Sequence, residues 1–165
     1  MSKLLNVNGK RDYFLLLISL IITNGLAYIV GNLTSNSAVV YQNLNKPIFS
    51  PPSWIFGVVW SILYFLMGVS LYRILMLKRQ GENVSVQITL FMIQFALNLL
   101  WSILFFYCGN ILAALLDLIL LVIFIILTIL SFYKKDKVAA ILLIPYLIWC
   151  VFALILNYNI YKLNK

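Results

Sequence analysis

The residues in this chain that could do chemistry are indoles, phenols and amides, and they recur at helical spacing within apolar stretches. At about 100° per residue, the stretch QFALNLLWSILFF places on one face Gln94, Asn98, Trp101, Ser102 and Phe105. The stretch PYLIWCVFALILNYNIY carries a narrower stripe of Tyr146, Trp149, Ala153, Asn157 and Ile160. A third stripe, which starts inside NKPIFSPPSWIFGVVW, consists of Ser53, Gly57, Trp60, Tyr64 and Gly68. Such side chains stack and hydrogen-bond, so they point to binding.

Two interpretations of these stripes are open. In the first, small residues allow helices to approach closely and amides hydrogen-bond between helices. That interpretation accounts for Gly57 and Gly68 but not for tryptophans inside a span, because tryptophan is typical of membrane interfaces. Trp60 lies about two helical turns inside its apolar stretch, and Trp149 lies near the middle of its own. Indoles beside amides and small residues favour a pocket for a flat aromatic ligand.

Ordinary hydrolytic or metal-dependent chemistry finds little support in the sequence. The chain contains no histidine, the commonest general base and a frequent metal ligand. Cys108 and Cys150 are isolated within apolar runs, which is typical of small hydrophobic side chains, although a disulfide or a metal pair is the alternative. We expect no metal site. Asp117 is the one acidic residue well inside a span, and it is either a functional group or a partner in a helix–helix hydrogen bond.

The elements that must position these residues are membrane-spanning helices. The 165 residues are 64% hydrophobic and 10% charged, with a mean hydropathy of +1.05, whereas soluble domains carry about 25% charged residues. We predict an all-α integral membrane bundle of five transmembrane helices in a single domain, residues 1–165. The expected helices are 13–31, 52–77, 86–107, 111–133 and 138–160, with a long outer loop over 32–51. Short links between the other helices predict antiparallel neighbours.

The net charge of +8 does not indicate a nucleic-acid partner, because the basic residues flank apolar runs and form no single patch. The N-terminal tail and the second and fourth links carry Lys3, Lys10, Arg11, Arg73, Lys78, Arg79, Lys134, Lys135 and Lys137. The opposite side has only Lys46, Lys162 and Lys165. The positive-inside rule therefore predicts a cytoplasmic N-terminus and an outer C-terminus. Richness in Asn, Lys and Ile favours a bacterial cell membrane.

Four motifs, in order along the chain, resemble the TspO/MBR family of tryptophan-rich sensory and translocator proteins, also called peripheral-type benzodiazepine receptors. The second span matches with Lys46-Pro47, Pro51-Pro52, Trp54, Phe56, Trp60, Leu63-Tyr64 and Gly68. The third matches with Gln94, Leu97-Asn98, Trp101-Ser102 and Phe105-Phe106, and the fourth with Asp117. The fifth matches with Ala140, Pro145-Tyr146-Leu147, Trp149, Phe152-Ala153 and Leu156-Asn157. One departure is Phe49, where family members often have tryptophan.

The resemblance implies a five-helix bundle, often a homodimer, whose pocket opens toward the 32–51 loop. The implied ligand is a porphyrin such as protoporphyrin IX or another flat hydrophobic molecule, and no cofactor is required. Relatives in mitochondria also bind cholesterol and synthetic drugs. Carried over position by position, the ligand-binding residues are Tyr41, Pro51, Phe56, Trp60, Tyr64, Asn98, Trp101, Ser102, Trp149 and Ala153. We also expect Lys46, at the pocket mouth, to attract the ligand's propionates.

Three functions remain open at this point. The leading one is a membrane receptor for porphyrins. The second is light- and oxygen-dependent porphyrin breakdown, as the resemblance implies for some bacterial relatives, with Trp60 and Trp149 as the catalytic residues. The third is a transporter of small hydrophobic or anionic ligands such as a sterol or a tetrapyrrole. The pattern Leu154-x3-Tyr158-x3-Lys162 fits either a sterol motif or an interfacial anchor.

Overall fold

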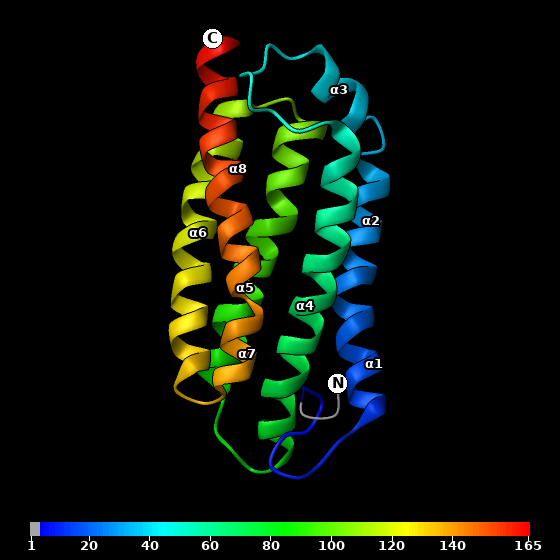
Figure 1. Cartoon of the computed structure of the whole chain (residues 1–165), viewed down its shortest axis with the longest axis vertical. Helices are drawn as coiled ribbons and strands as arrows, with labels where there is room; N and C mark the ends of the chain where they lie inside the picture. The colour runs from blue at the N-terminus through cyan, green and yellow to red at the C-terminus, as the bar shows by residue number, and fades with distance from the viewer. Residues whose placement is uncertain (1–3) are drawn as a thin grey trace.

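The computed structural model describes residues 4–165, which form an all-α bundle whose long helices run along one axis (Figure 1). Five helical stretches are long and apolar enough to cross a membrane: Tyr13–Leu33, Ser53–Arg79, Ser85–Tyr107, Ile111–Tyr133 and Lys137–Leu163. The shortest has 21 residues, and about 20 apolar residues span the hydrocarbon core of a bilayer. The chain is therefore a multi-pass membrane protein, which confirms the fold class expected from the sequence.

Two of these stretches contain a π-helical turn. In chain order the elements are α1 Tyr13–Leu20, a π-helical turn Ile21–Gly25, α2 Leu26–Leu33, α3 Ser37–Asn43, α4 Ser53–Arg79, α5 Ser85–Ser102, a π-helical turn Ile103–Tyr107, α6 Ile111–Tyr133, α7 Lys137–Leu142 and α8 Ile144–Leu163. Side-chain caps mark three helix starts. The Asp12 carboxylate accepts the backbone N–H of Leu15 at 3.0 Å, and the Asn110 amide oxygen accepts that of Ala113 at 3.0 Å. At the start of α7, the Asp136 carboxylate accepts the backbone N–H of Ala139 at 2.9 Å. These caps satisfy donors that the first helical turn leaves free.

Two features of the backbone go beyond the ranges expected from the sequence. The outer loop over 32–51 contains the short helix α3. The fifth stretch is divided at Leu143, because Pro145 has no N–H with which to continue the helical ladder. There the Leu143 N–H donates to the Ala140 carbonyl at 3.1 Å, three residues back, and α8 starts at Ile144.

The two ends of the bundle carry different segments (Figure 1). The N-terminal segment, the α4–α5 link and the α6–α7 link lie at one end, here called the N-terminal end. The helix α3, the α5–α6 link and the C-terminus lie at the other, here called the α3 end. Among residues 4–165, most basic residues lie at the N-terminal end. Lys3, which was counted with them, lies outside the described residues. The charge asymmetry along the sequence is thus an asymmetry between the two ends of the bundle.

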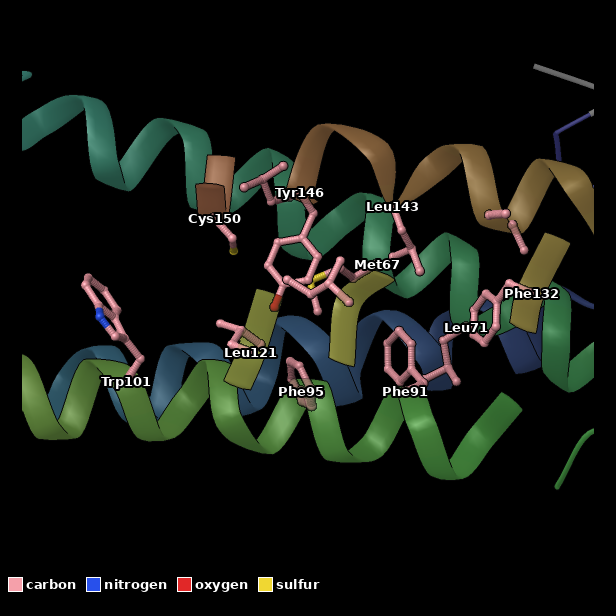
Figure 2. Close-up of a cluster of buried hydrophobic side chains, with 14 of the residues drawn as sticks. Met67, Leu71, Phe91, Phe95, Trp101, Leu121, Phe132, Leu143, Tyr146 and Cys150 are labelled. Carbon is pink, nitrogen blue, oxygen red and sulfur yellow. The ribbon is translucent and has the colours of Figure 1, made fainter. Parts of the chain in front are cut away.

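The core lies between α4, α5, α6 and α8, and stacked phenyl rings form its part toward the N-terminal end (Figure 2). The ring centroid of Phe91 lies 6.1 Å from that of Phe95 and 6.1 Å from that of Phe132. The first span lies at the edge, since 11% of its most apolar 18-residue stretch is buried against 39% of the corresponding stretch of α6. It packs on α4 at Gly68, where an added Cβ would lie 2.7 Å from the Thr23 hydroxyl oxygen. Only glycine allows this approach.

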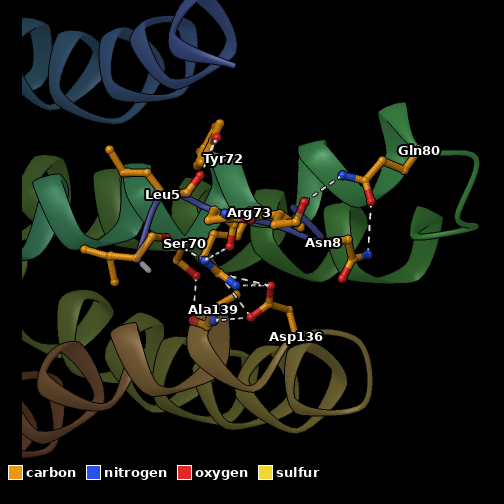
Figure 3. Close-up of polar contacts among 11 residues, drawn as sticks. Leu5, Asn8, Ser70, Tyr72, Arg73, Gln80, Asp136 and Ala139 are labelled. Atoms are coloured by element: carbon orange, nitrogen blue, oxygen red, sulfur yellow. Dashed lines mark hydrogen bonds and ion pairs between the residues drawn. The ribbon is translucent and has the colours of Figure 1, made fainter. Parts of the chain in front are cut away.

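Buried polar contacts join α4 to α7 near the N-terminal end (Figure 3). Arg73 and Asp136 form an ion pair with 2.8 Å between Nη2 and Oδ2, and both side chains are buried. One turn earlier, the Ser70 hydroxyl donates to the Ala139 carbonyl at 2.7 Å. Removing one partner of a buried pair leaves an uncompensated charge, so these contacts fix how the two helices meet.

Candidate ligand cavity

A cavity lined by aromatic side chains lies at the α3 end, between α2, α3, α4 and α5. Its volume of about 440 Å³ falls within the range of roughly 300–1,000 Å³ for small-molecule sites. Apolar and aromatic side chains dominate the lining, with a few amides and hydroxyls. The lining residues are Asn24, Ala27, Tyr28, Val30, Gly31, Thr34, Ser37, Ala38, Tyr41, Ser53, Phe56, Gly57, Trp60, Ser61, Tyr64, Trp101, Ser102 and Phe106. We call this the aromatic cavity.

The α4 wall of the aromatic cavity presents two stacked rings. Trp60 and Tyr64 have ring centroids 5.3 Å apart and an interplanar angle of 26°. The Tyr64 hydroxyl donates to the Asn98 amide oxygen at 2.8 Å, and Asn98 is buried. Asn98 therefore lies behind the wall and holds the phenol ring in place. The wall offers a broad aromatic face that is fixed before any ligand arrives.

The α5 wall is held by a second polar contact. The Trp101 indole N–H donates to the Asn157 amide oxygen at 3.1 Å, and the Asn157 amide nitrogen donates to the Ile111 carbonyl at 3.1 Å. These bonds link α5, α8 and α6. Because the indole N–H is already used, Trp101 can offer a ligand its ring surface only. The ring also stacks on Phe105, with centroids 5.3 Å apart.

The helix α3 covers the outer end of the aromatic cavity through Tyr41. The Tyr41 hydroxyl donates to the Pro51 carbonyl at 3.1 Å, and its ring meets Phe56 edge-on at 5.1 Å. Burial raises the pKa of the Tyr41 phenol, so it stays a donor. The Lys46 ammonium donates to the carbonyl oxygens of Tyr41, Gln42 and Leu44 at 2.7, 2.9 and 3.1 Å. These bonds hold the end of α3, and the attraction of Lys46 for the ligand's propionates stays a prediction.

The structure brings most of the expected ligand-binding residues together around the aromatic cavity. Those that line it are Tyr41, Phe56, Trp60, Tyr64, Trp101 and Ser102. Ala153 lines a much smaller adjoining space, and Pro51 contributes its carbonyl to the Tyr41 contact. Trp149 stands behind Phe56, with ring centroids 5.7 Å apart, and is absent from the lining. The two indoles expected to act together therefore differ in access to this space.

The contribution of the first span to the cavity was not expected from the sequence. Its inner face supplies Asn24, Ala27, Tyr28 and Gly31 to the cavity. These residues repeat at steps of three or four, so the stripe argument applied to 13–31 could have found them. Each π-helical turn also borders the cavity, one through Asn24 and the other through Phe106. Such turns occur frequently at functional sites.

Several buried polar atoms near the bundle centre have no hydrogen-bond partner among residues 4–165. They include both amide atoms of Gln94, the Asn98 amide nitrogen, the Trp149 indole nitrogen and one Asp117 carboxyl oxygen. Buried polar groups are generally satisfied, so these atoms are available to water or ligand. Asp117 faces the bundle interior from α6, outside the aromatic cavity.

Five apolar spans, three of which line an aromatic cavity, define a multi-pass membrane protein with a site of small-molecule size. The chain belongs to the TspO/MBR family, whose model matches residues 17–163. It is 46% identical to the tryptophan-rich protein TspO of Chlorobaculum tepidum over 75% of this chain and 78% of the relative. Its identity to the protein of the same name from Archaeoglobus fulgidus is 48%, over 75% and 79% of the two chains. The human translocator protein is 38% identical, over 75% and 74%.

Proposed function

We propose that the protein is a membrane receptor that binds a porphyrin in the aromatic cavity. The observation that carries this proposal is the pair of stacked rings, Trp60 and Tyr64, opposite the buried Trp101. Offset stacking on aromatic rings favours a flat, delocalised ligand. Ser102 and Asn24, which also line the cavity, supply polar groups to orient the ligand's edge. Since the chain has no histidine, a metalloporphyrin would be held by its ring and carboxylates, without an imidazole ligand.

Fluorescence titration tests this proposal directly. Purified full-length protein in detergent is titrated with protoporphyrin IX while quenching of tryptophan emission is recorded. Replacing Trp60 by leucine removes one stacking partner, worth about 0.5–1.5 kcal/mol, so we expect about 2- to 12-fold weaker binding. The matched control is Trp54→Leu, because Trp54 is 68% exposed on the same helix and does not line the cavity. Equal affinities for the two variants would contradict the proposed site.

A second candidate function is light- and oxygen-dependent breakdown of the bound porphyrin. The specific support is a set of aromatic contacts that lead from the cavity into the bundle. The ring centroids of Trp60 and Tyr146 are 6.2 Å apart, and those of Phe56 and Trp149 are 5.7 Å apart. In this proposal Trp60 is the oxidisable indole beside the ligand, and Trp149 acts from behind Phe56. The test is to illuminate the complex in air and follow the Soret band. If the band bleaches at the rate of free porphyrin, without a defined product, breakdown is refuted and only porphyrin binding remains of these two functions.

Transport of a small hydrophobic or anionic ligand is the remaining alternative. It requires a route from the aromatic cavity to the N-terminal end, where α4 is fully packed: Met67, Ile74 and Tyr72 are at most 1% exposed. We therefore rank transport below binding. Liposomes that contain the protein and show no protein-dependent porphyrin flux would exclude it.

We propose a bacterial cell membrane as the location, with the N-terminus in the cytoplasm and the C-terminus outside. The support is the excess of Lys and Arg at the N-terminal end and the bacterial source of relatives such as that from Chlorobaculum tepidum. The aromatic cavity and α3 would then lie toward the outer leaflet. We further propose a homodimer on the basis of the family resemblance. Light scattering in detergent checks the assembly, since a monomer mass at all concentrations would refute it.

A further inference from the structure

A second cavity lies at the N-terminal end of the bundle, far along the axis from the aromatic cavity. Its volume is about 390 Å³, and the residues that line it are Lys10, Arg11, Asp12, Met76, Arg79 and Gln80. We call it the basic pocket. It is built where the start of α1 meets the last turn of α4. Nothing in the proposed porphyrin function uses it.

The N-terminal segment that forms one side of the basic pocket is anchored by buried side chains of α4 (Figure 3). The Arg73 guanidinium donates to the Leu4 carbonyl, and the Tyr72 hydroxyl donates to the Leu5 carbonyl at 2.9 Å. The Gln80 amide donates to the Val7 carbonyl at 3.0 Å. Val7 and Lys10 also exchange two backbone hydrogen bonds, at 3.0 and 3.1 Å. These bonds fix the backbone that carries Lys10 and Arg11, so the pocket is preorganised.

The charges of the basic pocket do not cancel. Lys10, Arg11 and Arg79 supply three positive charges, and Asp12 supplies one negative charge. Asp12 is already engaged, since it pairs with Arg79 and caps α1. An anion is therefore the complementary ligand. Arginine side chains suit phosphate oxygens in particular, because the guanidinium can donate two parallel hydrogen bonds.

The surroundings of the basic pocket indicate that its ligand also has an apolar part. Directly after Asp12, Tyr13 and Phe14 are 64% and 71% exposed at the start of the first span. They face lipid at the level where the hydrocarbon core meets the headgroups. Met76 provides an apolar surface within the pocket itself. A ligand here would meet cations and the Met76 side chain in the pocket, and the exposed rings of Tyr13 and Phe14 follow directly along the chain at the start of α1.

We propose that the basic pocket binds the phosphate headgroup of an anionic phospholipid from the leaflet at the N-terminal end. The headgroup lies among Lys10, Arg11 and Arg79, and the acyl chains lie along the exposed face of α1. Basic pockets on the cytoplasmic side of membrane helices are suited to such headgroups. A soluble phosphate ester shares the headgroup chemistry but lacks the apolar contact, so it should bind far more weakly.

Native mass spectrometry of the full chain in detergent tests the proposal. The probes are phosphatidylglycerol and phosphatidylcholine with identical acyl chains, and we expect selective retention of phosphatidylglycerol. Each Lys or Arg near the membrane surface raises the affinity for an anionic lipid by a factor of about five. The double variant Lys10→Gln with Arg79→Gln should therefore weaken phosphatidylglycerol binding about 25-fold. The single variant Lys10→Gln keeps the Arg79–Asp12 pair and should lose about fivefold. It keeps the test decisive if the double variant unfolds.

The matched control removes the same charge at the same end of the bundle. Lys134→Gln with Lys137→Gln changes one cation of the α6–α7 link and one at the first residue of α7, and neither lines the basic pocket. An equal loss in the control pair, or equal retention of the two lipids, would overturn the site in favour of general surface charge. A third arm adds glycerol phosphate as a competitor. If glycerol phosphate displaces the lipid at comparable concentrations, the ligand of the basic pocket is a soluble phosphate ester and the lipid proposal is overturned.

Discussion

Replacing Gly68 by alanine tests how closely the first span must pack to frame the aromatic cavity. The new Cβ would lie 2.7 Å from the Thr23 hydroxyl oxygen, 2.8 Å from a Leu20 methyl carbon and 3.2 Å from the Leu20 Cα. Since the last of these is a backbone atom, a side-chain rotation alone cannot relieve the crowding, and α1 must move away from α4. The movement would displace Asn24 and Tyr28, which line the cavity four and eight residues beyond Leu20 in the same span.

The expected magnitude follows from two opposing terms. Overpacking a close helix contact costs about 2–3 kcal/mol when backbone has to shift. Replacing glycine by alanine inside a helix gains about 0.5–1 kcal/mol. The net loss in the free energy of unfolding is therefore about 1–2.5 kcal/mol for Gly68→Ala. Porphyrin affinity should fall as well, because one cavity wall moves.

The control for this prediction is Gly57→Ala on the same helix. An added Cβ at Gly57 has no atom within 4 Å, so the helix-propensity gain is unopposed and stability should rise by up to about 1 kcal/mol. Both variants are unfolded with a denaturing detergent in mixed micelles while tryptophan emission is followed. If Gly68→Ala proves as stable as Gly57→Ala, the close packing of α1 on α4 is refuted.

Four further changes test other parts of the molecule. Arg73→Gln should cost about 3–5 kcal/mol in the same unfolding assay, because Asp136 is left buried without its cation; a loss below 1 kcal/mol would contradict the buried pair. Tyr64→Phe removes the donor to Asn98 and should cost about 1–3 kcal/mol, and an unchanged stability would mean that this contact is dispensable. Trp101→Phe should cost a similar amount, since it leaves the Asn157 amide oxygen without the indole N–H. In intact cells a membrane-impermeant maleimide should label exposed Cys108 at the α3 end, while Cys108→Ser should abolish labelling because Cys150 is buried; labelling only after lysis would reverse the proposed orientation.

The fold was predictable from the sequence because lipid imposes one simple demand. A segment of about 20 apolar residues can satisfy its backbone hydrogen bonds only as a helix, and short links make successive helices neighbours. The helix α3 was not predicted, because so short a helix in a polar loop shows no clear helical repeat of apolar residues. The last span was predicted to be continuous, although Pro145 lacks the N–H that the helical hydrogen-bond ladder needs there.

The candidate site was predictable in part: its residues on α4 were predicted from the sequence, whereas those on α2 and the position of Trp149 on α8 were not. Trp60 and Tyr64 stand out because large aromatic and polar side chains share a face of an otherwise apolar helix. Gly31 and Ala27 carry no such signal on their own, and their place in the cavity depends on how α2 packs. The position of Trp149 behind Phe56 depends on the rotation of α8, which a stripe alone does not determine.

The π-helical turn Ile21–Gly25 makes the length of the first span adjustable by one residue. A π-helical turn holds one residue more than an α-helical turn, and here the Thr23 hydroxyl and Asn24 amide donate to the carbonyls of Ser19 and Leu20. Deleting one residue within the turn would restore α-helical geometry and leave α1 and α2 facing as before. The same deletion inside α1 would rotate everything after it by about 100° and turn the cavity face toward lipid. A one-residue deletion in this helix should therefore be tolerated at the turn and rejected on either side of it.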